Sequence, residues 1–259
     1  MTTNLGARTG MRPIGSRRSI ILMLACLLST SGVLGAPGRA APPDGPAAGD
    51  PAELKRLLQA FDAAQKRTGT MTARFTEEKR LRLLAEPVVS HGDFSFSRPN
   101  QVRWEFRDPE SRVFIITEGK YVAYYPGLRR AEEVPFSQFV GKRLFRFIGV
   151  GQSIADLGKY YDFRLEPRSD LEGTHLLVLT PRRKGLQERV AEMRIWVDDG
   201  TSLPRRIAYV EGEGDSTVIT FHNVRANVDV AEARFRIAFP SDVIVSDKFD
   251  GFALGGRGF

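Results

Sequence analysis

Residues 94–106 read Phe94-Ser95-Phe96-Ser97-Arg98-Pro99-Asn100-Gln101-Val102-Arg103-Trp104-Glu105-Phe106, and this stretch decides the fold. Successive strand side chains point to opposite faces of a sheet. The two alternating segments, joined by a Pro-Asn turn, therefore predict an antiparallel hairpin. Its apolar face carries Phe94, Phe96, Val102, Trp104 and Phe106, and its other face is polar.

Arg98 stands in the same alternating row as Phe94 and Phe96, which would remove its charge from water. A buried cation needs hydrogen-bond acceptors, and the carbonyl groups at a helix end supply them. We therefore predict that Arg98 is buried and donates hydrogen bonds to an element that covers this face. The combination indicates a cavity with a cover rather than a catalytic cleft.

The rest of the body continues the alternating pattern after one helix. Asp50 and Pro51 predict the start of that helix, and the pattern ends near Thr68-Gly69. Long antiparallel meanders of this kind build barrels or strongly curved sheets. The predicted strands are 71–80, 88–97, 102–106, 113–118, 121–125, 163–167, 174–181, 188–197, 204–210, 217–224 and 235–238.

Residues 135–161 interrupt this rhythm with short apolar helical turns that glycines separate. Phe145 and Ile148 belong to these turns and are candidates for the lining of a cavity, together with Phe75 and the aromatic residues of the hairpin. For Trp104 and each of the phenylalanines, ordinary core packing is the commoner alternative to ligand contact. The segment itself fits a fixed plug and a mobile lid equally well.

The amino-terminal residues 1–40 have the basic, apolar and small-residue regions of a signal peptide. Cleavage is expected near 35–40, after Gly35 or Ala40, and the paired arginines leave the Sec and twin-arginine routes open. The single cysteine, Cys26, lies within the apolar run and is expected to be removed. Residues 41–50 form a flexible lead-in, 51–249 one domain and 250–259 a flexible tail, which predicts an exported, periplasmic protein.

The net charge of +7 comes mostly from the export segment. Residues 1–40 hold five arginines and no acidic residue, which leaves 38 − 5 = 33 basic residues against 31 acidic ones. A balance of +2 is not the footprint of a nucleic-acid-binding protein. No nucleic-acid partner is therefore expected.

Nothing in the sequence predicts an enzyme, a metal site or a cofactor. His91, His175 and His222 lie on different strands without the spacing of metal ligands. Glu77 and Glu78 are neighbours on one strand, so they point to opposite faces and form no acid–base pair. Such charges are expected to lie on solvated faces.

Together these features resemble the periplasmic outer-membrane lipoprotein carrier family, LolA. The matching segments occur in family order and span nearly all of residues 51–249. They are Ala73-Arg74-Phe75-Thr76, Gly92-Asp93-Phe94, Arg98-Pro99-Asn100 with Trp104, Glu118-Gly119-Lys120 before Tyr124-Tyr125-Pro126, Leu177–Pro181, Val228–Phe235, Phe239-Pro240 and Val243-Ile244-Val245.

The resemblance implies a mainly β fold, an unclosed, strongly curved antiparallel half-barrel covered by short helices. It implies a monomeric, non-enzymatic carrier that takes acylated lipoproteins from an inner-membrane ABC-type release complex to an outer-membrane acceptor. It also implies that Arg98 is the latch that bonds the backbone of the lid in the closed state. Val102 departs from the family, which often has an aromatic residue there.

Three other functions stay open at this point. The same scaffold can carry another amphiphile, such as a glycolipid or a polyene-type lipid. A sensor domain that binds mislocalised lipoprotein would add a second domain, for which this chain is too short. A lipidated acceptor would need Cys26 as its first mature residue.

Overall fold

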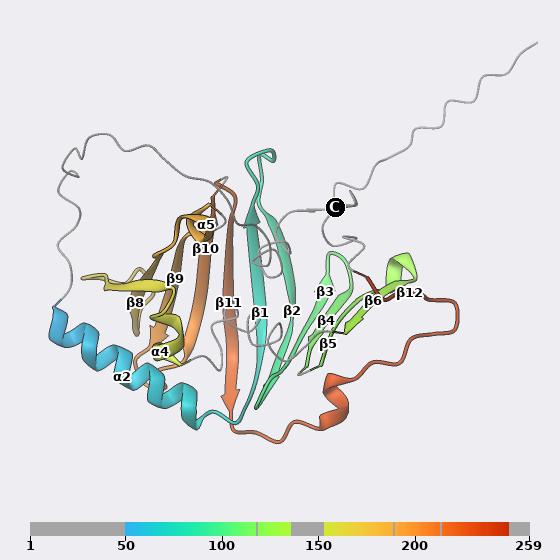
Figure 1. Cartoon of the computed structure of the whole chain (residues 1–259), viewed down its shortest axis with the longest axis horizontal. Helices are drawn as coiled ribbons and strands as arrows, with labels where there is room; N and C mark the ends of the chain where they lie inside the picture. Colours follow the sequence, from blue (N-terminus) through green and yellow to red (C-terminus); the bar gives the residue numbers. More distant parts are fainter. Residues whose placement is uncertain (1–49, 118, 136–152, 189, 213, 249–259) are drawn as a thin grey trace, which may run out of the picture.

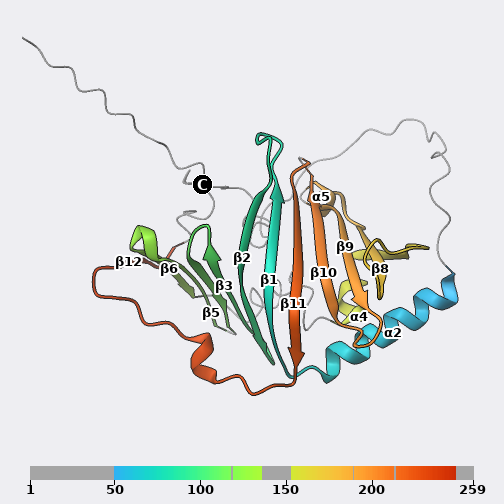
Figure 2. The same cartoon turned by 180° about the vertical axis from the view of Figure 1, so that it is seen from behind.

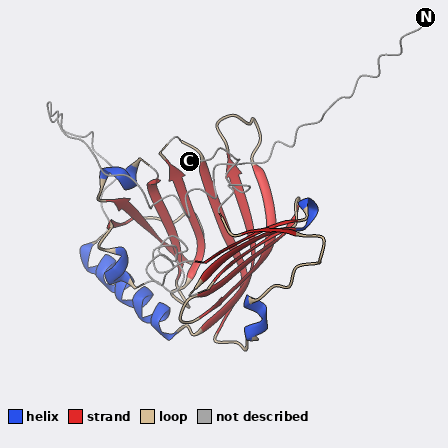
Figure 3. Cartoon of the chain, turned by 45° about the vertical axis from the view of Figure 1, so that its right-hand side comes forward, coloured by secondary structure: helices blue, strands red, loops and turns tan. Residues whose placement is uncertain are grey.

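The computed structural model describes residues 50–117, 119–135, 153–188, 190–212 and 214–248. Their strands form one unclosed sheet in the order β12-β6-β5-β4-β3-β2-β1-β11-β10-β9-β8-β7 (Figure 1). All neighbours are antiparallel except β12 and β6, which run parallel. Seen from behind and from the side, the sheet is continuous and strongly curved (Figures 2 and 3). The predicted fold class is therefore confirmed.

The first half of the chain gives β1 (Thr70–Arg80), β2 (Val88–Ser97), β3 (Gln101–Asp108), β4 (Arg112–Ile116), β5 (Lys120–Tyr125) and β6 (Arg130–Pro135). The second half gives β7 (Tyr161–Leu165), β8 (Thr174–Pro181), β9 (Val190–Asp198), β10 (Pro204–Glu211), β11 (Ser216–Ala226) and β12 (Ile244–Ser246). The helices are α2 (Pro51–Arg67), α4 (Ile154–Leu157) and α5 (Lys184–Gln187), with 3-10 turns η1 (Pro126–Leu128) and η2 (Glu232–Phe235).

Strands β2 and β3 form the predicted antiparallel hairpin. Phe94 lies opposite Trp104, Phe96 opposite Val102, and Gly92 opposite Phe106. A Cβ atom at Gly92 would lie 2.2 Å from the carbonyl oxygen of Glu105 and 2.6 Å from Cζ of Phe75. Only glycine therefore lets the Phe75 ring pack onto the backbone here.

Helix α2 begins as the sequence predicts, because the carboxylate of Asp50 accepts a hydrogen bond from the backbone N–H of Ala52 at 2.9 Å. Its apolar residues Leu57 and Phe61 are buried against the sheet. The helix lies across one end of strands β8 to β11, with α4 beside it (Figure 1). At its end, the hydroxyl of Thr68 donates to the carbonyl of Ala64 at 2.9 Å.

The two faces of the sheet bury apolar side chains in different ways. The concave face carries one large core that α2 joins. The outer face has two small clusters near its ends, one around Val113, Ile115 and Phe235 and one around Val178 and Trp196. The central strands β1, β2 and β11 carry mainly polar residues on the outer face.

One predicted strand is wrong, and two observed strands were not predicted. Residues 235–238 do not form a strand, because Phe235 ends the 3-10 turn η2 and packs into an outer-face cluster. Strands β6 and β12 were not expected. Buried and exposed residues do not alternate regularly along β6, which is placed by its pairing with β5. Strand β12 is a short, exposed edge strand.

Candidate functional site

The concave face presents a continuous apolar surface built mainly from aromatic rings. Phe75 meets Trp104 with 4.8 Å and Phe106 with 4.9 Å between ring centroids, and Phe94 meets Trp104 at 4.6 Å. All six candidates from the described residues lie on this face, and each is at most 5% exposed. They are Phe75, Phe94, Phe96, Val102, Trp104 and Phe106. Phe145 and Ile148 lie outside the described residues, as does most of the segment expected to be a plug or a lid.

Arg98 lies in the turn directly after β2, at the end of this apolar surface. Its Nε donates a hydrogen bond to the carbonyl of Thr68 at 2.8 Å, and its Nη2 donates to the carbonyl of Gln65. Both acceptors belong to the end of α2, where helix carbonyls lack intrahelical partners. The predicted hydrogen bonds to a helix end are present, but the predicted burial is wrong. Arg98 is exposed because the strand ends at Ser97, and the alternation that predicted burial ends with it.

The cover over this end includes α4 as well as α2. The carboxylate of Asp62 on α2 accepts a hydrogen bond from the backbone N–H of Ile154 at 2.9 Å, and it pairs with Lys66 at 2.6 Å. The hydrogen bond from Lys66 and that from Ile154 lower the pKa of Asp62 below the ordinary value of an aspartate. Asp62 therefore ties α4 to α2 while it is ionised.

The opposite end of the concave face carries a buried ion cluster, which we define as Glu77, Lys79 and Arg112. Glu77 Oε1 lies 3.2 Å from Lys79 Nζ and 3.5 Å from Arg112 Nη2. The guanidinium of Arg112 also stacks over the Phe106 ring at 4.0 Å. The expectation that Glu77 is solvated is wrong, whereas Glu78 points outward and pairs with the exposed Arg80.

The sequence contained a signal for this cluster. Glu77 and Lys79 continue the alternating row of Met71 and Phe75 along β1, and that row faces the concave-side core. Two tyrosines lie near this cluster: Tyr209 is buried and Tyr125 is partly buried. Burial, and next the charge of Glu77, raises the pKa of Tyr209; burial, and next the charge of Glu132, raises that of Tyr125. Both phenols therefore stay neutral at physiological pH.

Two N–H groups of the concave face have no acceptor within hydrogen-bond distance among the described residues. They are Nε1 of Trp104 and Nε of Arg112, both shielded from solvent. A buried donor without an acceptor is uncommon in folded proteins. These two N–H groups are therefore available to a ligand that brings its own acceptor oxygens.

The three histidines lie apart, each with its own partner. His91 bonds Asp108, His175 bonds Asp199, and His222 bonds Thr76. Over the described ranges, no three His, Cys, Asp or Glu side chains gather as a possible metal site. None of the helices in these ranges is both long and apolar enough to cross a membrane.

Comparisons with known proteins agree with this geometry. The family model described as "Outer membrane lipoprotein carrier protein LolA" matches residues 66–238. An outer-membrane lipoprotein carrier protein of Bordetella avium is 28% identical over 62% of this chain and 72% of its own length. One of Azotobacter vinelandii is 26% identical over 77% of this chain and 91% of its own length.

Among solved structures, the MucA/MucB complex of Pseudomonas aeruginosa resembles the chain with a TM-score of 0.45 at 17% identity. The match covers 72% of this chain and 61% of that one.

Proposed function

This chain belongs to the LolA family of outer-membrane lipoprotein carrier proteins, and on that premise we propose that it is a periplasmic lipoprotein carrier. Acylated lipoproteins reach it from an ABC-type release complex in the inner membrane and leave it at an acceptor in the outer membrane. The export segment at 1–40 supports the periplasmic location. Membership of a family of carrier proteins confirms the prediction that the chain is not an enzyme.

The observation that carries the proposal is the aromatic surface of the concave face. Each methylene removed from water gains about 0.8 kcal/mol, so a chain of about fifteen methylenes gains about 12 kcal/mol. An acyl chain therefore cannot cross an aqueous space without a partner that covers it. The rings of Phe75, Phe94 and Trp104 supply such a partner.

The unpartnered N–H groups of this face suit the polar part of the same cargo. Ester and amide groups at the head of acyl chains carry carbonyl oxygens, which are acceptors. Trp104 Nε1–H and Arg112 Nε–H have no acceptor within the part of the chain that the structure describes. Acylated cargo would satisfy both while its chains cover the apolar rings.

Arg98 supplies a contact that can break when cargo enters. Its two hydrogen bonds hold the end of α2 against the turn between β2 and β3. Because Arg98 is exposed, water can replace these bonds when the helix moves away. We expect cargo entry to break them and cargo release to restore them.

Native mass spectrometry of protein purified from the periplasm tests the carrier role. The protein is mixed with membranes that bear a tagged lipoprotein and its exporter. A one-to-one complex with the acylated lipoprotein, absent with the unacylated form, is expected. A bound free lipid without any protein partner would instead indicate a carrier of another amphiphile.

Arg98→Leu tests the closing contact. The variant should accept lipoprotein and retain it, because the closed state loses both hydrogen bonds. Transfer to outer membranes should fall at least tenfold. Arg80→Leu removes an exposed arginine at the far end of β1 and should transfer normally. Unchanged transfer by Arg98→Leu would refute the role given to this residue.

A further inference from the structure

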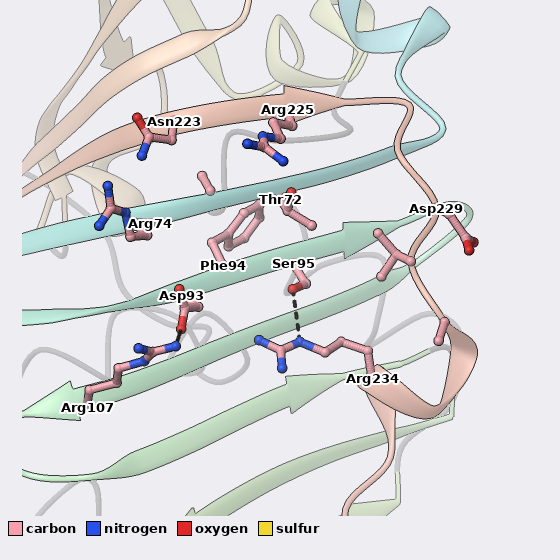
Figure 4. A pocket seen from close by; sticks show the side chains of 13 residues that line it. Thr72, Arg74, Asp93, Phe94, Ser95, Arg107, Asn223, Arg225, Asp229 and Arg234 are labelled. Atoms are coloured by element: carbon pink, nitrogen blue, oxygen red, sulfur yellow. Dashed lines mark hydrogen bonds and ion pairs between the residues drawn. The ribbon is translucent and has the colours of Figure 1, made fainter.

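A cavity lies on the outer face of the sheet, behind the apolar surface (Figure 4). Its volume is about 460 Å³. Strands β1, β2, β3 and β11 form its floor, and the segment 229–234 forms one wall. We call this cavity the outer pocket. Its charged lining residues are Arg74, Asp93, Arg107, Arg225, Asp229 and Arg234.

The wall of the outer pocket is fixed to the sheet. The hydroxyl of Thr70 donates to the carbonyl of Val228 at 2.5 Å, and the N–H of Asn227 donates to the carbonyl of Thr70 at 2.8 Å. Further along, Arg103 donates to the carbonyl of Arg234 at 3.3 Å. The pocket is therefore formed in advance, which lowers the entropy cost of binding.

Two of the four arginines are already neutralised by the protein. Arg107 pairs with Asp93, and Arg234 pairs with Glu105 at 3.2 Å and bonds Ser95. Arg74 and Arg225 have neither an ion-pair nor a hydrogen-bond partner among the described residues. Figure 4 shows that the Asp93 carboxylate points to Arg107, although Asp93 lies opposite Arg74 in the ladder.

A bulge in β11 brings these two free arginines together. Thr72 lies opposite Arg225, whereas Arg74 lies opposite His222, so β11 has one residue more than β1 here. The extra residue is accommodated at Asn223, whose φ of +53° is in the left-handed region. Without the bulge, Arg225 would face the concave side of the sheet instead of the outer side. With it, Arg74 and Arg225 are diagonal neighbours, about 7–8 Å apart by strand geometry.

We propose that the outer pocket binds an acidic segment of a partner protein, with glutamate or aspartate side chains between Arg74 and Arg225. Guanidinium groups recognise carboxylates through paired, charge-assisted hydrogen bonds. Two such groups on adjacent strands can hold one carboxylate from both sides or two carboxylates of one segment. The site goes beyond the carrier role, because cargo on the concave face touches none of these arginines.

A peptide fits this lining better than an anionic membrane does. Asp93 and Asp229 lie among the arginines and would repel lipid phosphates, whereas a peptide also brings N–H donors for carboxylates. The outer pocket also opens away from the concave face. A membrane bound there would lie on the side opposite the cargo site, whereas a protein segment can reach around the sheet.

The outer pocket adjoins the element that covers the cargo site. Gly69 donates from its N–H to Asn227 Oδ1 at 2.8 Å and accepts at its carbonyl from the N–H of Arg98 at 2.8 Å. One residue therefore bonds both the pocket wall and the turn that holds α2. A partner in this pocket would contact the carrier beside its closing contact.

The test measures binding of a fluorescent twelve-residue peptide with four glutamates to the full chain by fluorescence anisotropy. Its matched control peptide has glutamine at the four positions. The variant R74E/R225E reverses both free charges. R56E/R80E makes the same change at two exposed arginines outside the pocket. Vesicles with 30% phosphatidylglycerol, and inorganic phosphate as competitor, complete the set.

We expect the glutamate peptide to bind the wild type and R56E/R80E alike, and R74E/R225E at least tenfold more weakly. The glutamine peptide should bind at least tenfold more weakly, and higher salt should weaken binding of the glutamate peptide. Equal binding of both peptides, or equal loss in both variants, would overturn the proposal. The proposal would also be overturned if the peptide did not bind while the vesicles, or phosphate alone, bound in a way that depends on Arg74 and Arg225. Cargo binding is measured separately, so its failure would count against the carrier role alone.

Discussion

The two ends of the concave face carry their charges differently. Under α2, Arg98 is exposed and donates hydrogen bonds to neutral carbonyls, and water can replace it as the donor. At the other end, Glu77 and Lys79 are buried with Arg112. Breaking an exposed hydrogen bond costs about 1 kcal/mol, whereas removing one partner of a buried pair costs about 3–5 kcal/mol. Under the proposed function, the α2 end is therefore the one expected to open, and the ion cluster is expected to stay in place.

Glu77→Gln gives the largest expected effect on this comparison. It removes the carboxylate that pairs with the buried Lys79 and the partly buried Arg112, so the free energy of unfolding should fall by about 3–5 kcal/mol. Urea denaturation measures it. Glu78→Gln makes the same chemical change on the outward face and should cost less than about 1 kcal/mol. Similar losses in both variants would mean that the cluster is not the fixed end.

Substitutions at two glycines test the same comparison through the packing around the backbone. Gly92→Ala places a Cβ against the Glu105 carbonyl and the Phe75 ring, so it should destabilise by about 1–3 kcal/mol. Gly69→Ala, at the α2 end, meets nothing nearer than Asn227 Oδ1 at 3.6 Å and should change stability by less than about 1 kcal/mol. Thermal or urea unfolding compares them. A larger loss at Gly69 than at Gly92 would reverse the assignment of the two ends.

Asp62 gives the smallest expected effect and depends on pH. Its pKa is lowered in the folded state, so its contribution is fully present above the unfolded value of about 3.8 and is lost as pH falls through the folded value. Asp62→Asn should cost less than about 1 kcal/mol at pH 7, because the Lys66 pair is near the surface. Unfolding at pH 7 and pH 3 measures this. A difference between variant and wild type that grows toward pH 3 would contradict it.

Local alternation predicted most of the sheet correctly. In residues 94–106 it placed Phe94, Trp104 and their neighbours on one buried face, and Asp50 with Pro51 fixed the start of α2. These features depend on side-chain direction and capping within a few residues. Alternation by itself does not distinguish a closed barrel from an open, curved sheet. The family motifs added that the sheet is curved and unclosed.

The two errors about charged residues, the predicted burial of Arg98 and the predicted exposure of Glu77, concern where an alternating row begins and ends. Arg98 falls just past the last residue of β2 and is exposed, whereas Glu77 lies within β1 and is buried. Both residues belong to rows of aromatic or apolar side chains, so parity alone cannot separate them. The boundary of each strand separates them, and tertiary pairing sets that boundary.

The sequence by itself therefore determined most of the strands, the apolar face and the helix that begins at Pro51, because these follow from local direction and capping. Only the tertiary structure decided which charges meet. Arg112 reaches Glu77 across three intervening ladders of the curved sheet, and a bulge in β11 sets Arg225 beside Arg74. Such meetings depend on the register between distant strands, and register is a property of the assembled sheet.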